Sequence, residues 1–282
     1  MPQEEKSERL PATVTILTYN NGRTLETCLR SVAAFDDILV LDGGSTDETR
    51  EIAARYGARV VDQSDTPGPI ADFTAVRERS FVLAKHDWIL WLDSDEWADE
   101  GLIESIKTAL QQRGTTLSFT ADRVPIVDGR VIRYAYFLPD RVLRFVHRRH
   151  AHWAKGKKVH EHLAVDQGVR VEHLEGSIFT PWNSVEQYQK KDRYYLSLAF
   201  SKPLERRPPF SVIFRAVLKN LAQAANIFCQ AAILSLRYGK TGAVLPWPYH
   251  SRFAVYHLAV ARERVRQFAY GRSYQPPLPS AS

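Results

Sequence analysis

The first third of the chain alternates between short β-branched or aliphatic runs and stretches in which apolar residues recur every three or four positions. Residues 14–18 form the first run. After a polar turn, residues 24–34 place their apolar side chains on one face (Leu25, Cys28, Leu29 and Val32). This order predicts a strand, a turn and an amphipathic helix.

The same order then repeats. Residues 38–41 are an apolar strand candidate, residues 47–56 a helix candidate and residues 58–61 a third strand candidate. Alternation of this kind predicts a βαβαβ unit with a parallel sheet, whose ligands bind at the carboxyl ends of the strands. Glycines after Asp42 allow a sharp turn, and Ser45 or Thr46 is predicted to cap the helix that follows.

Residues 88–97 (WILWLDSDEW) are an apolar strand candidate that ends in three carboxylates: Asp93, Asp95 and Glu96. Acids crowded at a strand end repel one another unless a cation lies among them, and oxygen ligands select Mg²⁺ or Mn²⁺. A divalent cation held there can bind a diphosphate. The alternative is a solvated turn before the next helix, with Asp99 and Glu100 in its first turn.

Several segments resemble one enzyme family. The sequences TILTYNNGRTLETCLRSV, DDILVLDGGSTDETREIA and HDWILWLDSDEW resemble the nucleotide-binding half of family-2 glycosyltransferases of the GT-A fold. Farther along, PDRVLRFVHRRHAHW and KVHEHL resemble the subgroup of lipopolysaccharide-core glucosyltransferases. The resemblance covers about residues 12–200. It implies an α/β fold, a Rossmann-like and mostly parallel sheet flanked by helices, and transfer of a sugar from a nucleotide-sugar.

The resemblance also implies roles for particular residues. Asp95 would bind the metal, Mg²⁺ or Mn²⁺, and Asp93 would bind the ribose or the metal through water. The remaining nucleotide-sugar contacts are expected from the base or ribose ligand Asp42, from the floor residues Thr18, Tyr19 and Asn20, and from the phosphate-binding Arg77 and Arg144. The nucleotide is expected to be UDP.

The segment 159–163 carries the second group of candidates. In a strand, His160 and His162 share one face and Glu161 takes the other, whereas in a loop all three can converge. His160 can complete the coordination of a metal, and Glu161 is the first candidate for the base that deprotonates the acceptor, with Glu96 second. A base opposite the diphosphate implies inversion at the anomeric carbon. The alternative is a pair of exposed strand histidines.

Two departures from the family pattern matter, and the absence of a third motif bears on the type of reaction. Thr180 stands where related sequences have a histidine, so a metal ligand is either missing or replaced by His160. Arg77 is followed by Glu78 in place of an asparagine. No Q-x-x-R-W motif occurs in the chain, which favours a single addition over processive polymer synthesis.

Charge divides the chain. Its net charge is +6, yet residues 206–272 contain eleven Lys or Arg against the single acid Glu263. A proline-rich stretch, 203–209, marks the change. We therefore expect a disordered lead-in (1–11), a glycosyltransferase domain (12–202, divided into a nucleotide-sugar half 12–115 and an acceptor and catalytic half 116–202), a helical membrane-associating extension (203–272) and a flexible tail (273–282).

Residues 210–238 form a long apolar segment with one polar stripe: Arg215, Lys219, Gln223, Asn226 and Gln230. Three settings fit such a helix. It could span a membrane, pack against the helix expected at 251–270, or lie on anionic lipid with its basic residues at the headgroups. The aromatic residues at 247–256 suit a membrane boundary. The basic tail contains no nucleic-acid docking motif, so a nucleic-acid partner is not expected.

These features together predict an inverting, metal-dependent hexosyltransferase that acts on a glycolipid or lipid-linked glycan such as lipopolysaccharide core. Residues 1–11 carry no secretory signal, so we expect a cytoplasmic protein, peripheral on the inner membrane. Cys28 and Cys229 are expected to be core thiols. Alternatives are an inactive glycosyltransferase-like scaffold and a nucleotidyltransferase. The turn Tyr-Asn-Asn-Gly excludes a dinucleotide oxidoreductase, which requires G-x-G-x-x-G there.

Overall fold

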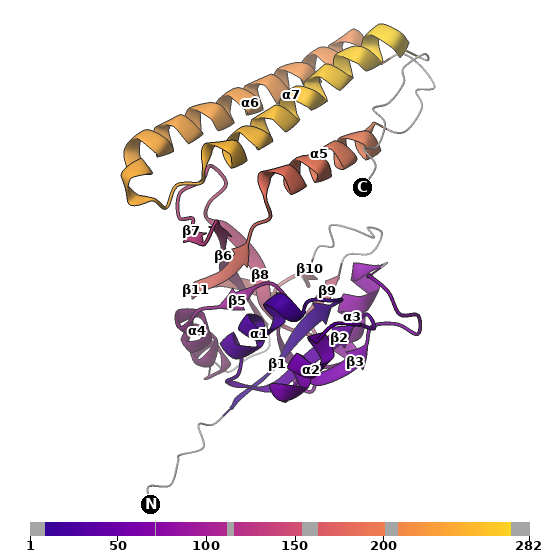
Figure 1. Ribbon diagram of the computed structural model, residues 1–282, viewed down its shortest axis with the longest axis vertical. Coiled ribbons are helices and arrows are strands. Elements are labelled where there is room, and N and C mark those ends of the chain that lie inside the picture. Colours follow the sequence, from indigo (N-terminus) through magenta and orange to yellow (C-terminus); the bar gives the residue numbers. More distant parts are fainter. Residues whose placement is uncertain (1–8, 71, 112–115, 154–162, 201–207, 272–282) are drawn as a thin grey trace, which may run out of the picture. The chain divides into compact units, whose positions relative to one another are not determined.

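The computed structural model describes residues 9–70, 72–111, 116–153, 163–200 and 208–271. The chain forms two compact units: an α/β unit (residues 1–124 and 139–181) and a helical unit (residues 125–138 and 182–282). The elements, labelled in Figure 1, are β1 (Leu10–Thr18), α1 (Gly22–Ser31), β2 (Phe35–Asp42), α2 (Thr49–Arg55), β3 (Arg59–Asp62), α3 (Phe73–Leu83), β4 (Trp88–Asp93), β5 (Trp97–Ala98), α4 (Glu100–Gln111), β6 (Leu117–Val127), β7 (Arg130–Val131), β8 (Asp140–His147), β9 (Ala151–Trp153), β10 (Leu163–Val165), β11 (Arg170–Pro181), α5 (Val185–Ala199), α6 (Phe210–Tyr238), η1 (Gly239–Thr241) and α7 (Trp247–Tyr270).

The main sheet runs in the order β3-β2-β1-β4-β8-β6-β11-β5. Strands β3, β2, β1 and β4 pair in parallel, whereas β8 pairs antiparallel to both β4 and β6. The predicted βαβαβ unit is therefore confirmed. So is the predicted fold class, a Rossmann-like sheet flanked by helices and followed by C-terminal helices. Because β1, β2 and β4 are parallel neighbours, their carboxyl ends meet at one edge of the sheet.

Alternation along the central strands supplies two hydrophobic faces. One face includes Ile16, Val40 and Leu92 and packs in one core with buried residues of α1, α2 and α4. The other face includes Leu17 and Leu41 and packs against α3. Successive side chains of a strand point to opposite faces, so strands that are apolar throughout are buried on both sides by helices.

The helical unit is dominated by α6 and α7, which are antiparallel and lie side by side (Figure 1). Phe210, at the start of α6, contacts Phe268 near the end of α7 with ring centroids 5.8 Å apart. Near the middle of α6, Asn220 hydrogen bonds to His257 over 2.9 Å. Of the three settings considered for the 210–238 helix, packing against the C-terminal helix is observed, and lying on anionic lipid stays a prediction. None of the described helices is long and apolar enough to cross a membrane.

Two further predictions concern the cysteines and the boundary between the domains. Cys229 is exposed on α6 and is not a core thiol, whereas Cys28 is buried as expected. The two compact units separate the chain at 124–125, 138–139 and 181–182. The predicted functional boundary at 202–203 concerns membrane association, and it stays a prediction.

Candidate active site

The loop after β2 is organised by Asp42. Thr18, at the end of β1, lies opposite Asp42 in the strand register and donates its hydroxyl hydrogen bond to that carboxylate over 2.9 Å. The backbone N–H groups of Gly44 and Ser45 donate to the other carboxylate oxygen over 3.0 and 2.8 Å. Asp42 is fully buried. Its hydrogen-bonding capacity is spent within the protein, which is typical of a residue that positions a loop.

The same loop is tied to the turn after β1. Asn20 has φ 53°, in the left-handed region that asparagine tolerates, and its side-chain oxygen accepts from Thr46 N over 2.9 Å. Asn20 N donates to the Ser45 hydroxyl over 2.8 Å. The ring of Tyr19 is 36% exposed beside Gly43. The predicted nucleotide floor is thus a rigid surface formed by two cross-linked turns.

Gly43 is required by close packing. A Cβ at this position would lie 2.5 Å from the carbonyl oxygen of Gly68 and 2.9 Å from the Tyr19 ring. The predicted helix cap at Ser45 or Thr46 is wrong, because α2 begins at Thr49 with Glu48 at its N-cap, and the Ser45 hydroxyl donates to Asp42 instead. A cavity of about 560 Å³ is lined by the 63–69 loop, which includes Gly68, and by residues of α3.

The three acids predicted from the sequence form a tight turn after β4. Asp93 lies opposite Leu17 in the β1–β4 register, so the turn is next to the end of β1. Asp93 N donates to a Glu96 carboxylate oxygen over 3.1 Å, and Glu96 N donates to the Asp93 carbonyl over 3.0 Å. We call residues 93–96 the acid turn.

Two buried arginines flank one tryptophan beneath this turn. The guanidinium carbon of Arg144 lies 3.7 Å from the centre of the Trp91 ring, and that of Arg77 lies 4.4 Å from it. Trp91 is itself fixed, because its indole N–H donates to the carbonyl of Leu143 over 2.9 Å. Stacking on an aromatic face orients a guanidinium and stabilises its charge away from water.

Each arginine is paired with one acid of the turn. Arg77 forms a close ion pair with Asp93, whose side chain is still 45% exposed. Desolvation opposes the ionisation of Asp93, but Arg77 and Arg144 outweigh it and lower the Asp93 pKa. Arg144 donates to Glu96 over 2.8 Å, and both side chains are about 1% exposed. Thr180 donates its hydroxyl hydrogen bond to the same Glu96 oxygen over 3.1 Å.

Asp95 differs from its two neighbours. Among the described side chains, none donates a hydrogen bond to the Asp95 carboxylate, and none forms an ion pair with it, in contrast to the pairs of Asp93 and Glu96. Burial and the negative charges of Asp93 and Glu96 raise the Asp95 pKa to about 6. Asp95 is therefore a carboxylate whose ionised form a positive partner would stabilise.

The acid turn also indicates which residues could hold a divalent cation. The described residues contain no cluster of three or more His, Cys, Asp or Glu side chains that could hold a metal ion. One available carboxylate suits Mg²⁺ or Mn²⁺ bound jointly by the protein and the phosphates of a nucleotide, which is the usual arrangement for Mg²⁺. Asp95, with Asp93 beside it, is the group that fits such an ion.

The remaining predicted site residues divide into two groups. His160 and Glu161 lie outside the described residues, so their roles stay predictions. Arg77 and Arg144 are in the site, but both are at most 1% exposed and are engaged by Asp93 and Glu96. The sequence interpretation missed Trp91, although it shares a face of β4 with Asp93, two residues along the strand.

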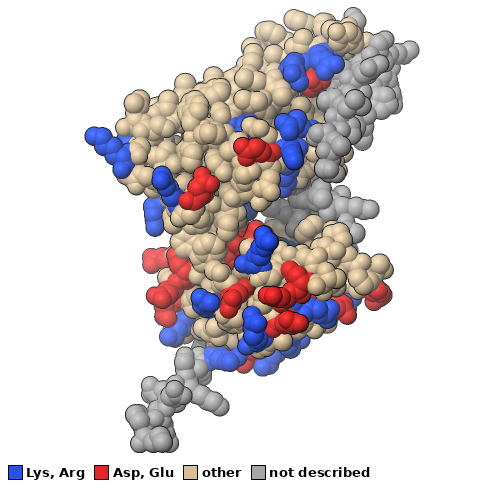
Figure 2. Space-filling model, in the orientation of Figure 1, with Lys and Arg blue, Asp and Glu red and all other residues tan. Residues whose placement is uncertain are grey.

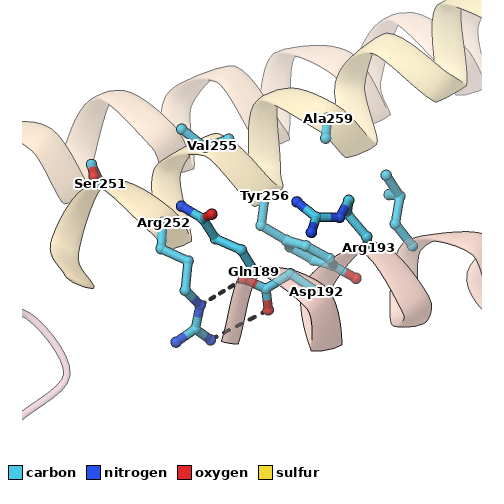
Figure 3. A pocket seen from close by; sticks show the side chains of 9 residues that line it. Gln189, Asp192, Arg193, Ser251, Arg252, Val255, Tyr256 and Ala259 are labelled. Carbon is cyan, nitrogen blue, oxygen red and sulfur yellow. Dashed lines mark hydrogen bonds and ion pairs between the residues drawn. The ribbon is translucent and has the colours of Figure 1, made fainter. Parts of the chain in front are cut away.

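A separate cavity of about 320 Å³ lies between α5 and α7 in the helical unit (Figure 3). Arg252 reaches from α7 toward Asp192 on α5, with N–O distances of 2.6 and 3.4 Å. The guanidinium of Arg252 also lies 4.4 Å from the centre of the Tyr188 ring. This pair closes one side of the cavity and links the two helices.

Comparisons with known proteins identify the family of the chain. The family model described as glycosyl transferase family 2 matches residues 13–175. A TPR repeat-containing protein of Synechococcus elongatus is 34% identical over 122 residues, which are 41% of this chain but only 28% of that protein. The lipopolysaccharide core biosynthesis glycosyltransferase LpsC of Rhizobium meliloti is 25% identical over 193 residues, 66% of this chain and 69% of LpsC.

Among solved structures, S. aureus TarS in complex with UDP aligns with a TM-score of 0.46 and 15% identity, covering 94% of this chain and 93% of that one.

Proposed function

Since this chain belongs to glycosyl transferase family 2, we propose that it transfers one sugar from a nucleoside-diphospho-sugar, in the first place a UDP-sugar, to a hydroxyl group of a membrane-linked glycan. The observation that carries the proposal is the state of the acid turn. Two of its acids are neutralised by buried arginines, and among the described residues Asp95 has no such partner at the edge where β1, β2 and β4 end. Ligands of open α/β sheets bind at this edge.

The proposed donor site combines this turn with the floor formed by Thr18, Tyr19 and Asn20. The exposed Tyr19 ring offers an aromatic surface for the base. Asp95 would hold Mg²⁺ or Mn²⁺ together with the diphosphate, with Asp93 near the ribose or the ion. The ion, when bound, would neutralise charge on the leaving diphosphate.

The transfer then has a defined balance of bonds. The acceptor oxygen attacks the anomeric carbon on the face opposite the diphosphate while the bond between that carbon and the diphosphate oxygen breaks. The bonding electrons leave with the nucleoside diphosphate, and the acceptor proton goes to a base. We assign this base to Glu161, because Glu96 is buried and already accepts from Arg144 and Thr180. In-line attack inverts the anomeric centre.

The acceptor is proposed to be a glycolipid or lipid-linked glycan such as lipopolysaccharide core, at the cytoplasmic face of the inner membrane. The similarity to LpsC, whose name assigns it to lipopolysaccharide core biosynthesis, supports this choice. The excess of cations over acids in residues 206–272 supports an anionic membrane partner.

A thermal-shift panel of nucleotide-sugars with and without Mn²⁺ tests the donor part of the proposal. A ligand at a hundred times its dissociation constant adds about 2.7 kcal/mol of stability, a shift that is easily measured. We expect such a shift for a UDP-sugar with Mn²⁺ in the wild type and in Asp166→Asn, a control at an exposed acid outside the acid turn. Asp95→Asn should lose the Mn²⁺-dependent part. A shift that is unchanged in Asp95→Asn would refute the role of Asp95.

A further inference from the structure

Helix α6 is apolar on two sides. Its inner side, which includes Ala224, Ile227 and Ala231, is buried, and the first two pack in one core with Ala254 of α7. Its outer side carries large apolar side chains that remain exposed: Phe214 (50%), Leu218 (49%), Leu221 (43%), Ile233 (60%) and Leu236 (88%). We call these five residues the outer apolar face. Soluble monomers seldom expose so many large apolar side chains on one helix without a binding partner.

Cations border this face. Arg215, Lys219 and Arg237 are exposed and share the polar stripe of α6 with Gln223 and Asn226. The stripe follows three-, four- and seven-residue steps, so it forms one flank of the helix next to the outer apolar face. Residues 210–238 contain no Asp or Glu. In the view of Figure 2, the surface over α6 and α7 is mainly uncharged and its blue groups lie toward its margins.

We propose that the outer apolar face of α6 docks on the surface of an anionic lipid bilayer. An apolar face buried at the level of the headgroups, beside a cationic flank, is the arrangement by which amphipathic helices lie in a membrane surface. Lys and Arg side chains reach the headgroups while their aliphatic stems lie along apolar surface. The apolar side chains supply burial, and the cations select negatively charged lipid.

Charge favours an anionic lipid surface over a second copy of the chain as the partner of this face. Two α6 helices that covered each other's outer apolar faces would bring together helices that carry Arg215, Lys219 and Arg237 and no acid. Like charges brought together at an interface oppose association. Anionic headgroups instead complement all three cations. The inference rests on the membrane partner of the proposed function and assigns the contact to α6, whereas its test does not require sugar transfer.

The outer apolar face contains a natural labelling site with which this contact can be tested. Cys229 is exposed and lies at helical spacing from Leu218, Ala222 and Leu236, which places it within the outer apolar face. The other cysteine, Cys28, is fully buried, and burial raises the pKa of its thiol. A thiol-reactive, polarity-sensitive fluorophore should therefore label Cys229 selectively in the folded full-length protein.

The experiment titrates labelled wild-type protein with vesicles of phosphatidylcholine alone and of phosphatidylcholine with phosphatidylglycerol. We expect a blue shift of the emission, and quenching by lipids with a spin label on the acyl chain, only with the anionic vesicles. Replacing Arg215, Lys219 and Arg237 by Gln should weaken binding roughly a hundredfold at low salt. High salt should weaken the wild type as well.

A second variant tests the apolar contribution. Leu218→Asp with Leu221→Asp should reduce binding at least about tenfold. The matched control is Val82→Asp, which places an acid at a 79% exposed valine of α3 and should bind as the wild type does. Circular dichroism checks that each variant is folded, and the labelled wild type gives a result even if a variant is not.

Each outcome decides the proposal. Anionic-selective insertion of the probe supports it. A blue shift that needs no vesicles and grows with protein concentration would identify a second copy as the partner and overturn it. Absence of any shift, or equal binding to both kinds of vesicle at all salt concentrations, would also overturn it. Donor binding measured on the same samples is a separate readout, so failure here is distinguishable from failure of the proposed function.

Discussion

Two carboxylates at the ends of the strands that flank β1, Asp42 at the end of β2 and Asp95 after β4, have opposite surroundings. Asp42 is fully buried and accepts hydrogen bonds from Thr18, Gly44 and Ser45. Asp95 lies between two other acids, and burial together with their charges raises its pKa to about 6. An acid whose partners are built in holds the fold together, whereas an acid surrounded by like charge is available to a ligand.

The acid turn contains the same contrast within four residues. Glu96 has Arg144 and Thr180 as partners and Asp93 has Arg77, so their charges are balanced before any ligand arrives. The turn therefore keeps about one unbalanced negative charge, on Asp95. A divalent cation would reverse that sign and favour a diphosphate, which is the electrostatic basis of the proposed donor site.

The largest expected effect concerns the proposed base, Glu161, which belongs to neither of these two loops in the sequence. Glu161→Gln keeps the shape of the side chain but cannot take a proton, so turnover should fall roughly 10²- to 10⁴-fold while donor affinity stays nearly unchanged. Steady-state kinetics and calorimetric titration with UDP measure the two quantities. A comparable loss from Glu96→Gln, with no loss from Glu161→Gln, would move the role to the acid turn.

The next largest effect concerns the stability that the buried Arg144 gives by pairing with Glu96. Arg144→Met removes the cation from a pair that is about 1% exposed on both sides. It leaves Glu96 buried and unpaired, so the free energy of unfolding should fall by roughly 3–5 kcal/mol in denaturant titration. The control is Arg30→Met, which breaks an exposed pair with Glu26 and should lower the free energy of unfolding far less. Similar losses in the two variants would contradict the claim that the buried pair of Arg144 and Glu96 holds the fold together.

A smaller effect separates two roles for Asp42. Asn at this position turns an acceptor into a donor that faces other donors, so we expect a loss of about 1–3 kcal/mol in stability. Nucleotide affinity, measured where the variant is still folded, should change little. Lost affinity with unchanged stability would show instead that Asp42 binds the base or ribose directly, as the family resemblance implies.

The sequence predicted well what periodicity and strand ends determine. The parallel order of β1, β2 and β3 follows from apolar runs separated by amphipathic segments, and the acid turn follows from three carboxylates after an apolar strand. The long α6 helix was also predicted with its observed bounds. Each of these features depends on neighbours in the sequence.

Partners that are distant in the sequence could not be predicted in this way. Arg144 is 48 residues from Glu96, and Thr180 is 84 residues from it. Ser45 or Thr46 was predicted to cap the helix that follows, but α2 begins only at Thr49 with Glu48 at its N-cap, and the Ser45 hydroxyl donates to Asp42. The outer apolar face of α6 was hidden for a similar reason, because the sequence does not show which apolar side packs against α7.

The most direct test of the contrast is the stability of the metal-free protein, in EDTA, for wild type and Asp95→Asn at pH 5 and pH 8. A raised folded-state pKa means that the folded protein binds the Asp95 proton more tightly than the unfolded chain does. The resulting stability is present in full below the unfolded pKa of about 4 and is lost as the pH rises through about 6.

At pH 8 the ionised Asp95 should therefore destabilise the wild type, and Asp95→Asn should be the more stable protein by about 1 kcal/mol in denaturant titration. At pH 5 this advantage should shrink by a similar amount, because the wild-type carboxyl is then mostly protonated. A variant that is less stable than the wild type at pH 8, or a difference that does not change with pH, would contradict the claim that Asp95 is the acid reserved for a cation.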